Sequence, residues 1–202
     1  REPDELSDDE LRGLGRLLAR IHNVGAMKQP VDRPVLDADT ALLDPLDEML
    51  DGSWLPPSCE ERYATAVESL ADVYAERLEG VPLLRIHGDC HLGNLLRGRE
   101  GWFFLDFDDF ALGPAVHDVW VLVPGHQRDV LIEGYRQFRD FEPRWLALVE
   151  PLRAARILKI SSWIARRWKE RSFQSTFPHF GTALYWESET RDLEELVRRL
   201  EP

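Results

Sequence analysis

Apolar side chains recur at intervals of three and four positions along most of the chain, a spacing typical of helices that bury one face. The first such segment follows Ser7 and Glu10, whose spacing matches a capping box, and continues with Leu11, Leu14 and Leu18. A second capping box, at Ser58 and Glu61, predicts another helix that runs to Leu78. Further helices are predicted over Thr40–Leu50, Ala115–Val123, Arg128–Phe138, Arg144–Glu170 and Gly181–Leu200.

The period changes in the middle of the chain, where short apolar runs alternate with polar loops. Strands are predicted over Leu83–Ile86, Leu95–Arg97 and Trp102–Leu105, and a polar loop is predicted from His87 to Asn94. The pattern therefore predicts an α+β fold that is mostly helical, with one small strand cluster at its centre.

The composition is that of a globular protein with an acidic balance. The 202 residues suit one domain, and 37 acidic against 25 basic side chains give a formal net charge of −12. That charge argues against a nucleic acid or an anionic membrane as partner, because both need a basic face. The two cysteines are too few for a disulfide framework, and no apolar run approaches the roughly 20 residues of a membrane span. We therefore expect a cytoplasmic protein that acts as a monomer.

The polar loop and the strand that follows it carry the candidate chemistry. Asp89 is followed five positions later by Asn94, and Asp106 comes at the end of a predicted strand. Two short strands joined by a turn would bring Asn94 and Asp106 side by side, with Asp89 on the loop before them. A carboxylate and an amide oxygen suit Mg²⁺, and a second carboxylate can accept a proton from an attacking hydroxyl. This combination indicates phosphoryl transfer from ATP.

The motifs around these residues resemble those of the aminoglycoside-phosphotransferase-like kinases. The loop has the sequence HGDCHLGN, similar to the family's HGDxxxxN, where protein kinases carry HRDxxxxN. The strand end LDFDD, followed by Gly113, Pro114 and Asp118, resembles the family's second metal motif and the helix after it. Within this family, the chain is most similar to bacterial serine/threonine protein kinases in the segments GDCHLGN, GPAVHDVW and RILKISSWIARRW.

The resemblance implies a role for each candidate residue. It implies that Asp89 is the catalytic base and that Asn94 and Asp106 hold Mg²⁺ on the phosphates of ATP, so that Asp106 is a catalytic residue as well as a metal ligand. Leu96 and Leu105 are expected to supply apolar surface under the adenine. The expected supporting residues are His87 and Gly88, which shape the catalytic loop, Asp108 with Asp109, which assist the metal, and Asp118, which ties the loop to the next helix.

The resemblance also implies that residues 1–202 form a single C-terminal lobe of a protein-kinase-like fold. Residues 1–82 and 119–202 are expected to be its helical parts, and residues 83–118 its catalytic and metal-binding core. No strand pair is predicted before Leu11, and the early lysine, Lys28, lies in a loop. The lobe that covers ATP is therefore expected to be absent, and the chain, which starts with Arg1, is expected to be an excised lobe that is inactive alone.

The expected reaction is ATP-dependent phosphorylation of a protein Ser or Thr hydroxyl, with two alternatives. One keeps the fold and the reaction but has a small alcohol or aminoalcohol as acceptor, as in aminoglycoside, choline or homoserine kinases. The other is a nucleotide-binding or docking module without turnover. An upstream lysine on a strand of the parent protein would favour turnover over such a module.

Some residues also allow readings outside kinase chemistry. Asp106 and Asp108 could form the DxD metal motif of a glycosyl or hydrolytic enzyme, but that leaves Asp89 unexplained. Cys90 and His91 could form a soft-metal or nucleophile pair, although no further ligand stands at suitable spacing. The late helix is rich in arginine and tryptophan: Arg156, Trp163, Arg166, Arg167 and Trp168. These residues could line a peptide or phosphate site. We favour a structural helix, in which the tryptophans fill the core and the arginines pair with acidic side chains.

Overall fold

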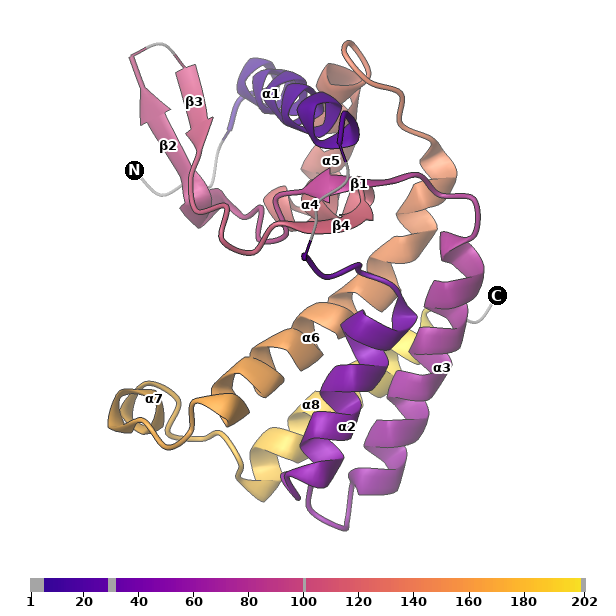
Figure 1. Ribbon diagram of the computed structural model, residues 1–202, viewed down its shortest axis with the longest axis vertical. Coiled ribbons are helices and arrows are strands. Elements are labelled where there is room, and N and C mark those ends of the chain that lie inside the picture. The colour runs from indigo at the N-terminus through magenta and orange to yellow at the C-terminus, as the bar shows by residue number, and fades with distance from the viewer. Residues whose placement is uncertain (1–5, 29–31, 100, 201–202) are drawn as a thin grey trace. The chain divides into compact units, whose positions relative to one another are not determined.

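The computed structural model describes residues 6–28, 32–99 and 101–200, so the ends of the predicted lobe lie outside the described residues. The chain divides into two compact units (Figure 1), and each unit is built from two separate segments of sequence. The first unit contains residues 1–36 and 80–149, and the second contains residues 37–79 and 150–202. In the described part of the chain, no helix has the length and apolar character needed to cross a membrane.

The first unit is built on helix α1 (Asp8–Ala26), and its start confirms the predicted capping box. The Ser7 hydroxyl accepts the Glu10 backbone N–H, and the Glu10 carboxylate accepts the Ser7 N–H at 3.1 Å. The predicted apolar face is buried, since Leu11, Leu14 and Leu18 are at most 2% exposed. Local sequence therefore fixes both where this helix begins and which face it buries.

Helix α1 packs against helix α5 (Gly125–Tyr135) through glycines on both helices. A Cβ atom on Gly15 would overlap the Leu131 carbonyl, and one on Gly134 would overlap the Arg12 backbone. The two helix backbones therefore lie closer together than larger side chains would allow. The first unit is completed by helix α4 (Val116–Leu122) and the 3₁₀ segment η3 (Pro143–Leu148).

The strands of the first unit form two separate antiparallel pairs, whereas the sequence predicted one strand cluster. Strand β2 (Leu95–Gly98) pairs with β3 (Gly101–Phe104), which confirms the predicted hairpin. Strand β1 (Leu83–Ile86) pairs with β4 (Ala111–Pro114), a strand that was not predicted. The sequence ALGP ends in glycine and proline and is typical of a turn, so only the pairing with β1 makes this segment a strand.

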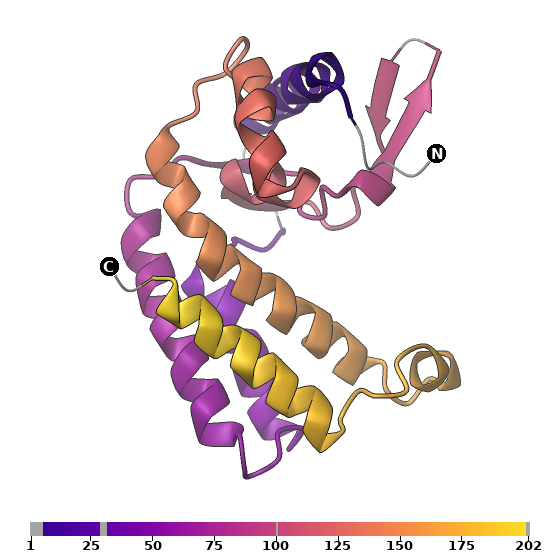
Figure 2. The ribbon, with the colours of Figure 1, turned by 180° about the vertical axis from the view of Figure 1, so that it is seen from behind.

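The second unit is helical. It contains a π-helical turn η1 (Asp39–Leu43) that leads into α2 (Asp44–Asp51), which agrees with the helix predicted over Thr40–Leu50. The remaining helices are α3 (Glu60–Leu78), α6 (Val149–Arg166), α7 (Arg171–Thr176) and α8 (Ala183–Arg198), and Figure 2 shows α8 alongside α3 and α6.

The predicted apolar face of α3 is confirmed, but its predicted cap is wrong. Tyr63, Val67, Leu70 and Tyr74 are completely buried. The helix begins at Glu60 after Cys59, and no side chain caps it. The Pro56 carbonyl instead accepts the N–H groups of Cys59 and Glu60, so a proline turn takes the place of the capping box expected at Ser58 and Glu61.

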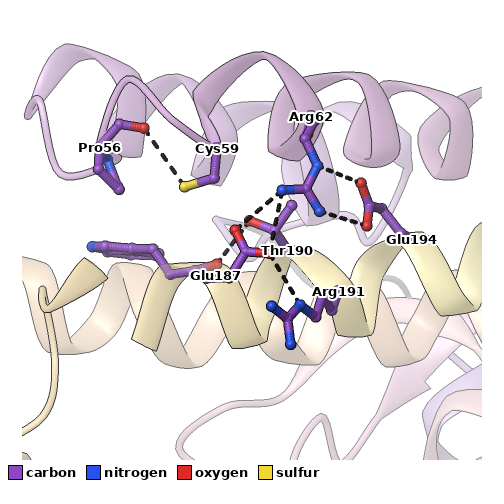
Figure 3. A network of polar contacts seen from close by, with 8 residues as sticks. Pro56, Cys59, Arg62, Glu187, Thr190, Arg191 and Glu194 are labelled. Atoms are coloured by element: carbon purple, nitrogen blue, oxygen red, sulfur yellow. Dashed lines mark hydrogen bonds and ion pairs between the residues drawn. The ribbon is translucent and has the colours of Figure 1, made fainter. Parts of the chain in front are cut away.

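Polar contacts join α3 to its neighbours both at the surface and inside the unit. Figure 3 shows Arg62 between Glu194, which it binds through two nitrogens at 2.8 Å, and Glu187, at 3.1 Å. Beneath it, the nearly buried Glu189 accepts the Tyr63 hydroxyl at 2.8 Å and the Ser161 hydroxyl at 2.7 Å. Burial raises the pKa of Glu189 above its ordinary value, although these hydroxyls lower it. The network therefore links α3, α6 and α8.

The helix predicted over Arg144–Glu170 is divided into η3, α6 and the start of the segment leading to α7. Arg166 pairs with Glu48 at 2.7 Å and Arg167 with Glu170 at 3.0 Å, which confirms that these arginines meet acidic residues. Trp163 is 44% exposed, however, so the expectation that tryptophans of this helix fill the core is wrong for that residue.

The contact between α1 and α5 gives a stability prediction. Gly134→Ala places a methyl group against the Arg12 backbone and should cost about 1–3 kcal/mol of unfolding free energy, because overpacking strains the surrounding structure. Gly125→Ala on the same helix points into open space and should be neutral or slightly stabilising. Urea unfolding followed by circular dichroism measures both, and equal midpoints for the two variants would contradict the close approach.

Candidate active site

The loop after β1 is held through its backbone by a buried carboxylate on α4. Asp118 is fully buried, and its Oδ2 atom accepts the His87 N–H at 2.7 Å while Oδ1 accepts the Gly88 N–H at 3.1 Å. The His22 ring on α1 lies 3.0 Å from Oδ2, and its other nitrogen contacts the Tyr135 hydroxyl at 2.8 Å. Asp118 therefore joins the loop to two helices of the first unit.

The pKa of Asp118 is lowered although its side chain is fully buried. Burial alone would raise its pKa, but hydrogen bonds with His117, at 3.3 Å, and His22 outweigh burial and hold the pKa well below its ordinary value of 3.8. The charge is compensated by donors on several sides, which is the condition for a carboxylate to stay ionised inside a protein.

Asp89 and Asn94 lie in contact on this loop. The Asn94 Nδ2 atom donates to the Asp89 carbonyl at 3.0 Å and lies 3.4 Å from the Asp89 Oδ2 atom. Both side chains are half-buried. The contact fixes the orientation of the Asn94 amide, because its nitrogen faces Asp89 and its oxygen is left to receive other ligands.

Asp106 follows the strand that pairs with the Asn94 segment. The Leu105 N–H donates to the Asn94 carbonyl at 2.8 Å, so Asp106 is one residue beyond the point at which the hairpin reaches Asn94. Asp106 is exposed, and its φ of 59° lies in the left-handed region that non-glycine residues rarely adopt. A strained backbone at this position is a feature often found at functional sites.

Further contacts place the loop of residues 105–110 against the loop of residues 87–94. The His87 Nε2 atom lies 2.8 Å from the Leu105 carbonyl, and the His87 ring packs on Phe107 with centroids 4.5 Å apart. Gly88 has a φ of 81°, and a Cβ atom there would overlap the Asp109 carbonyl. Glycine is therefore required both for the backbone conformation and for the close approach of the two loops.

The outer face of the β2–β3 hairpin is apolar. Leu96 stands opposite Phe103 in the strand register, and the two are 52% and 47% exposed. Leu105 continues the Phe103 face and is 45% exposed. The sequence-predicted pair Leu96 and Leu105 therefore borders an exposed apolar surface that starts beside Asn94.

The donor set of the site suits a hard cation and not a soft one. Among the described residues, no three His, Cys, Asp or Glu side chains gather into a group that could hold a metal ion, so neither the Cys90–His91 pair nor the acidic residues around Asp106 form a complete site from such side chains alone. Burial raises the pKa of the Cys90 thiol well above its ordinary value, and the charges of Asp118 and Asp89 raise it further, so the thiol is protonated and a poor nucleophile. The amide oxygen of Asn94 and the carboxylate of Asp106 are oxygen ligands of the kind that Mg²⁺ takes.

Part of this geometry was not predicted from the sequence. His22 pairs with Asp118 across 96 positions of sequence. The approach of the Asp109 backbone to Gly88 depends on the pairing of β4 with β1, and the local sequence did not predict β4. The sequence signal for the His22–Asp118 pair was a polar histidine on an otherwise apolar helix face.

Comparison with known sequences and structures gives a consistent result. The profile of the phosphotransferase enzyme family matches residues 1–149. Stress response kinase A of Escherichia coli strain K12 is 34% identical over 200 residues, which cover 96% of this chain and 61% of the relative. Serine/threonine protein kinase RdoA of Salmonella typhimurium is 32% identical over 199 residues, 95% of this chain and 60% of the relative. The chain thus spans about three fifths of the curated relatives it matches.

Solved structures share the fold at low sequence identity. Amicoumacin kinase hAmiN, in complex with AMP-PNP, Ca²⁺ and Ami, has a TM-score of 0.65 and 17% identity, covering 96% of this chain and 60% of its own. A microcompartment-associated aminopropanol kinase has a TM-score of 0.64 and 21% identity, covering 98% and 64%. These likenesses confirm the predicted fold class, while the family match and the curated relatives confirm the resemblance drawn from the motifs.

The buried Asp118 gives a pH-dependent prediction. Its pKa is lower in the folded chain than in the unfolded one, so its stabilisation is present above about pH 4 and is lost as the pH falls further. At pH 7, Asp118→Asn should cost about 3 kcal/mol, because buried donors lose their charged acceptor. Urea unfolding should show that this difference between variant and parent shrinks at pH 3.

The control for this prediction is Asp129→Asn, which changes an exposed aspartate of α5. It should unfold like the parent at both pH values. An Asp118→Asn effect as small as that of the control, or one that does not depend on pH, would refute the role of the buried charge.

Proposed function

Because the chain belongs to the phosphotransferase enzyme family, we propose that it is the catalytic part of an ATP- and Mg²⁺-dependent kinase that phosphorylates protein Ser or Thr hydroxyls. The observation that carries the proposal is the meeting of Asp89, Asn94 and the Asp106 strand end through the contacts Asn94 Nδ2–Asp89 and Leu105 N–H to Asn94. The protein acceptor is supported by the names of relatives such as serine/threonine protein kinase RdoA.

Asp89 is the proposed catalytic base. The oxygen of the acceptor hydroxyl forms a bond to the γ-phosphorus of ATP as the bond to the β-phosphate oxygen breaks, and the hydroxyl proton passes to the Asp89 carboxylate. A carboxylate is suited to this step because it only has to orient the nucleophile and accept its proton late in the transfer. The contact with Asn94 restricts the positions that the carboxylate can take.

Asn94 and Asp106 are the proposed ligands of Mg²⁺. The Asn94 Nδ2 atom donates to Asp89, so the Oδ1 atom is the one left to face a cation. Asp106 supplies an exposed carboxylate one residue beyond the backbone contact with Asn94. A Mg²⁺ ion held by these two side chains would supply positive charge to offset that of the ATP phosphates. The nearby Asp108 adds negative charge to the same turn.

Leu96 and Leu105 are proposed to lie under the adenine of ATP. Both are exposed apolar residues on the hairpin face that begins beside Asn94. Covering this surface with a nucleobase would remove apolar area from water, which favours binding. We further propose that the protein works as a monomer in the cytoplasm, with no nucleic acid or membrane as partner.

A small-molecule acceptor is the second candidate. The structural neighbours include kinases named for aminopropanol and glucosamine, although their low identity supports the shared fold alone. Radiolabel transfer from ATP by the full-length protein, offered Ser- and Thr-containing peptides and small alcohols in parallel, separates the two. Nucleotide binding without transfer to any acceptor would favour a binding module instead.

The base has a direct test in the full-length protein. Asp89→Asn should lower kcat for phosphate transfer by about a hundredfold or more, because general-base catalysis contributes that much, while the affinity for ATP stays the same. Steady-state kinetics and nucleotide titration measure the two quantities. An unchanged kcat would remove Asp89 from the role.

The metal ligand is tested by Asp106→Asn. Loss of one carboxylate should raise the Mg²⁺ concentration needed for half-maximal activity about tenfold or more and lower kcat, because the amide binds the cation more weakly. A magnesium titration of activity measures the shift. Asp140→Asn, at an exposed position outside the site, should keep the parent's magnesium dependence; a parent-like curve for Asp106→Asn would exclude it as a ligand.

A further inference from the structure

We infer that His91 is a positioning residue for the carboxylate of Asp89. We also infer that Gly93 holds the His91 ring in the tautomer that has its proton on Nε2, the nitrogen facing this carboxylate. The inference rests on the proposed function, in which Asp89 is the base. It adds a residue with no part in binding metal or nucleotide, and it assigns a purpose to the glycine in the sequence HLGN.

The backbone of Gly93 selects the tautomer of His91. The Gly93 N–H donates to the His91 Nδ1 atom at 3.0 Å, so Nδ1 is an acceptor and carries no proton. In the neutral imidazole the proton then sits on Nε2, because one ring nitrogen donates when the other accepts.

The protonated nitrogen faces the proposed base. His91 Nε2 lies 3.3 Å from Asp89 Oδ2, the same oxygen that Asn94 Nδ2 approaches at 3.4 Å. One carboxylate oxygen therefore accepts the Asn94 Nδ2 hydrogen bond and also lies 3.3 Å from His91 Nε2. A carboxylate with side chains on two sides has fewer positions open to it, and it can meet an incoming hydroxyl with less reorientation.

The absence of a side chain at position 93 makes room for the ring. A Cβ atom on Gly93 would lie 2.7 Å from the His91 Cε1 atom and 2.9 Å from Nδ1. Both distances are shorter than ordinary carbon contacts, so an alanine would push the ring from its place. The histidine side chain is 38% exposed and has space to move outward. Gly93→Ala should therefore disturb Asp89 through His91.

A double-mutant cycle in the full-length protein tests this coupling. His91→Ala should lower kcat about tenfold to a hundredfold, with the KM for ATP unchanged, because a misplaced base slows transfer without affecting nucleotide binding. Gly93→Ala should lower kcat in the same direction. The double variant should be no slower than His91→Ala alone, because the glycine acts only through the histidine.

Two further variants separate positioning from structure. His91→Gln keeps a side-chain N–H donor and should recover most of the lost kcat. His126→Ala replaces an exposed histidine outside the site and should match the parent. Urea midpoints are measured for every variant, and if His91→Ala fails to fold, Gly93→Ala and His91→Gln carry the comparison.

The outcomes are distinguishable. A parent-like kcat for His91→Ala, or losses from His91→Ala and Gly93→Ala that multiply in the double variant, would overturn the inference. If Asp89→Asn abolishes transfer while His91→Ala does not slow it, the proposed function stands and the role of His91 falls. If Asp89→Asn leaves transfer unchanged, the chain is still a kinase, but the role of Asp89 as base falls and the role of His91 falls with it.

Discussion

The carboxylate of Asp118 accepts the backbone N–H groups of His87 and Gly88, and the position of the loop that carries Asp89 depends on that interaction. The buried charge is tolerated because His22 and His117 also contact it. His22 comes from α1 and Asp118 from α4, so one carboxylate links the loop to two helices. Asp89 directly follows His87 and Gly88, so its side chain is attached to a backbone that these hydrogen bonds hold in place.

The second loop is placed against the first mainly through backbone atoms. The Leu105 carbonyl meets the His87 ring, the Leu105 N–H meets the Asn94 carbonyl, and the Asp109 carbonyl lies against Gly88. The carboxylate of Asp106 is left exposed at the turn between these contacts. None of these three contacts uses the Asp106 carboxylate, so the contacts that hold the loop do not compete with a cation for it.

Contacts between residues close in sequence could be predicted, and contacts set by distant segments could not. Asn94 lies five positions after Asp89, and the hairpin that carries Asp106 follows from alternating apolar residues, so their neighbourhood could be predicted from spacing. Strand β4 could not, because its glycine and proline favour a turn and only β1 makes it a strand. The contact of His91 with Asp89 was missed for a different reason: it depends on where the Gly93 N–H points, which composition does not reveal.

We propose that Asn94 and Asp106 hold one divalent cation beside Asp89. A crystal structure of the full-length protein with a non-hydrolysable ATP analogue and Mn²⁺, located by its anomalous scattering, tests this most sharply. We expect an anomalous peak about 2 Å from the Asn94 Oδ1 atom and from an Asp106 carboxylate oxygen. A peak held by other residues, with Asn94 and Asp106 apart from it, would show that these two side chains are not the ligands.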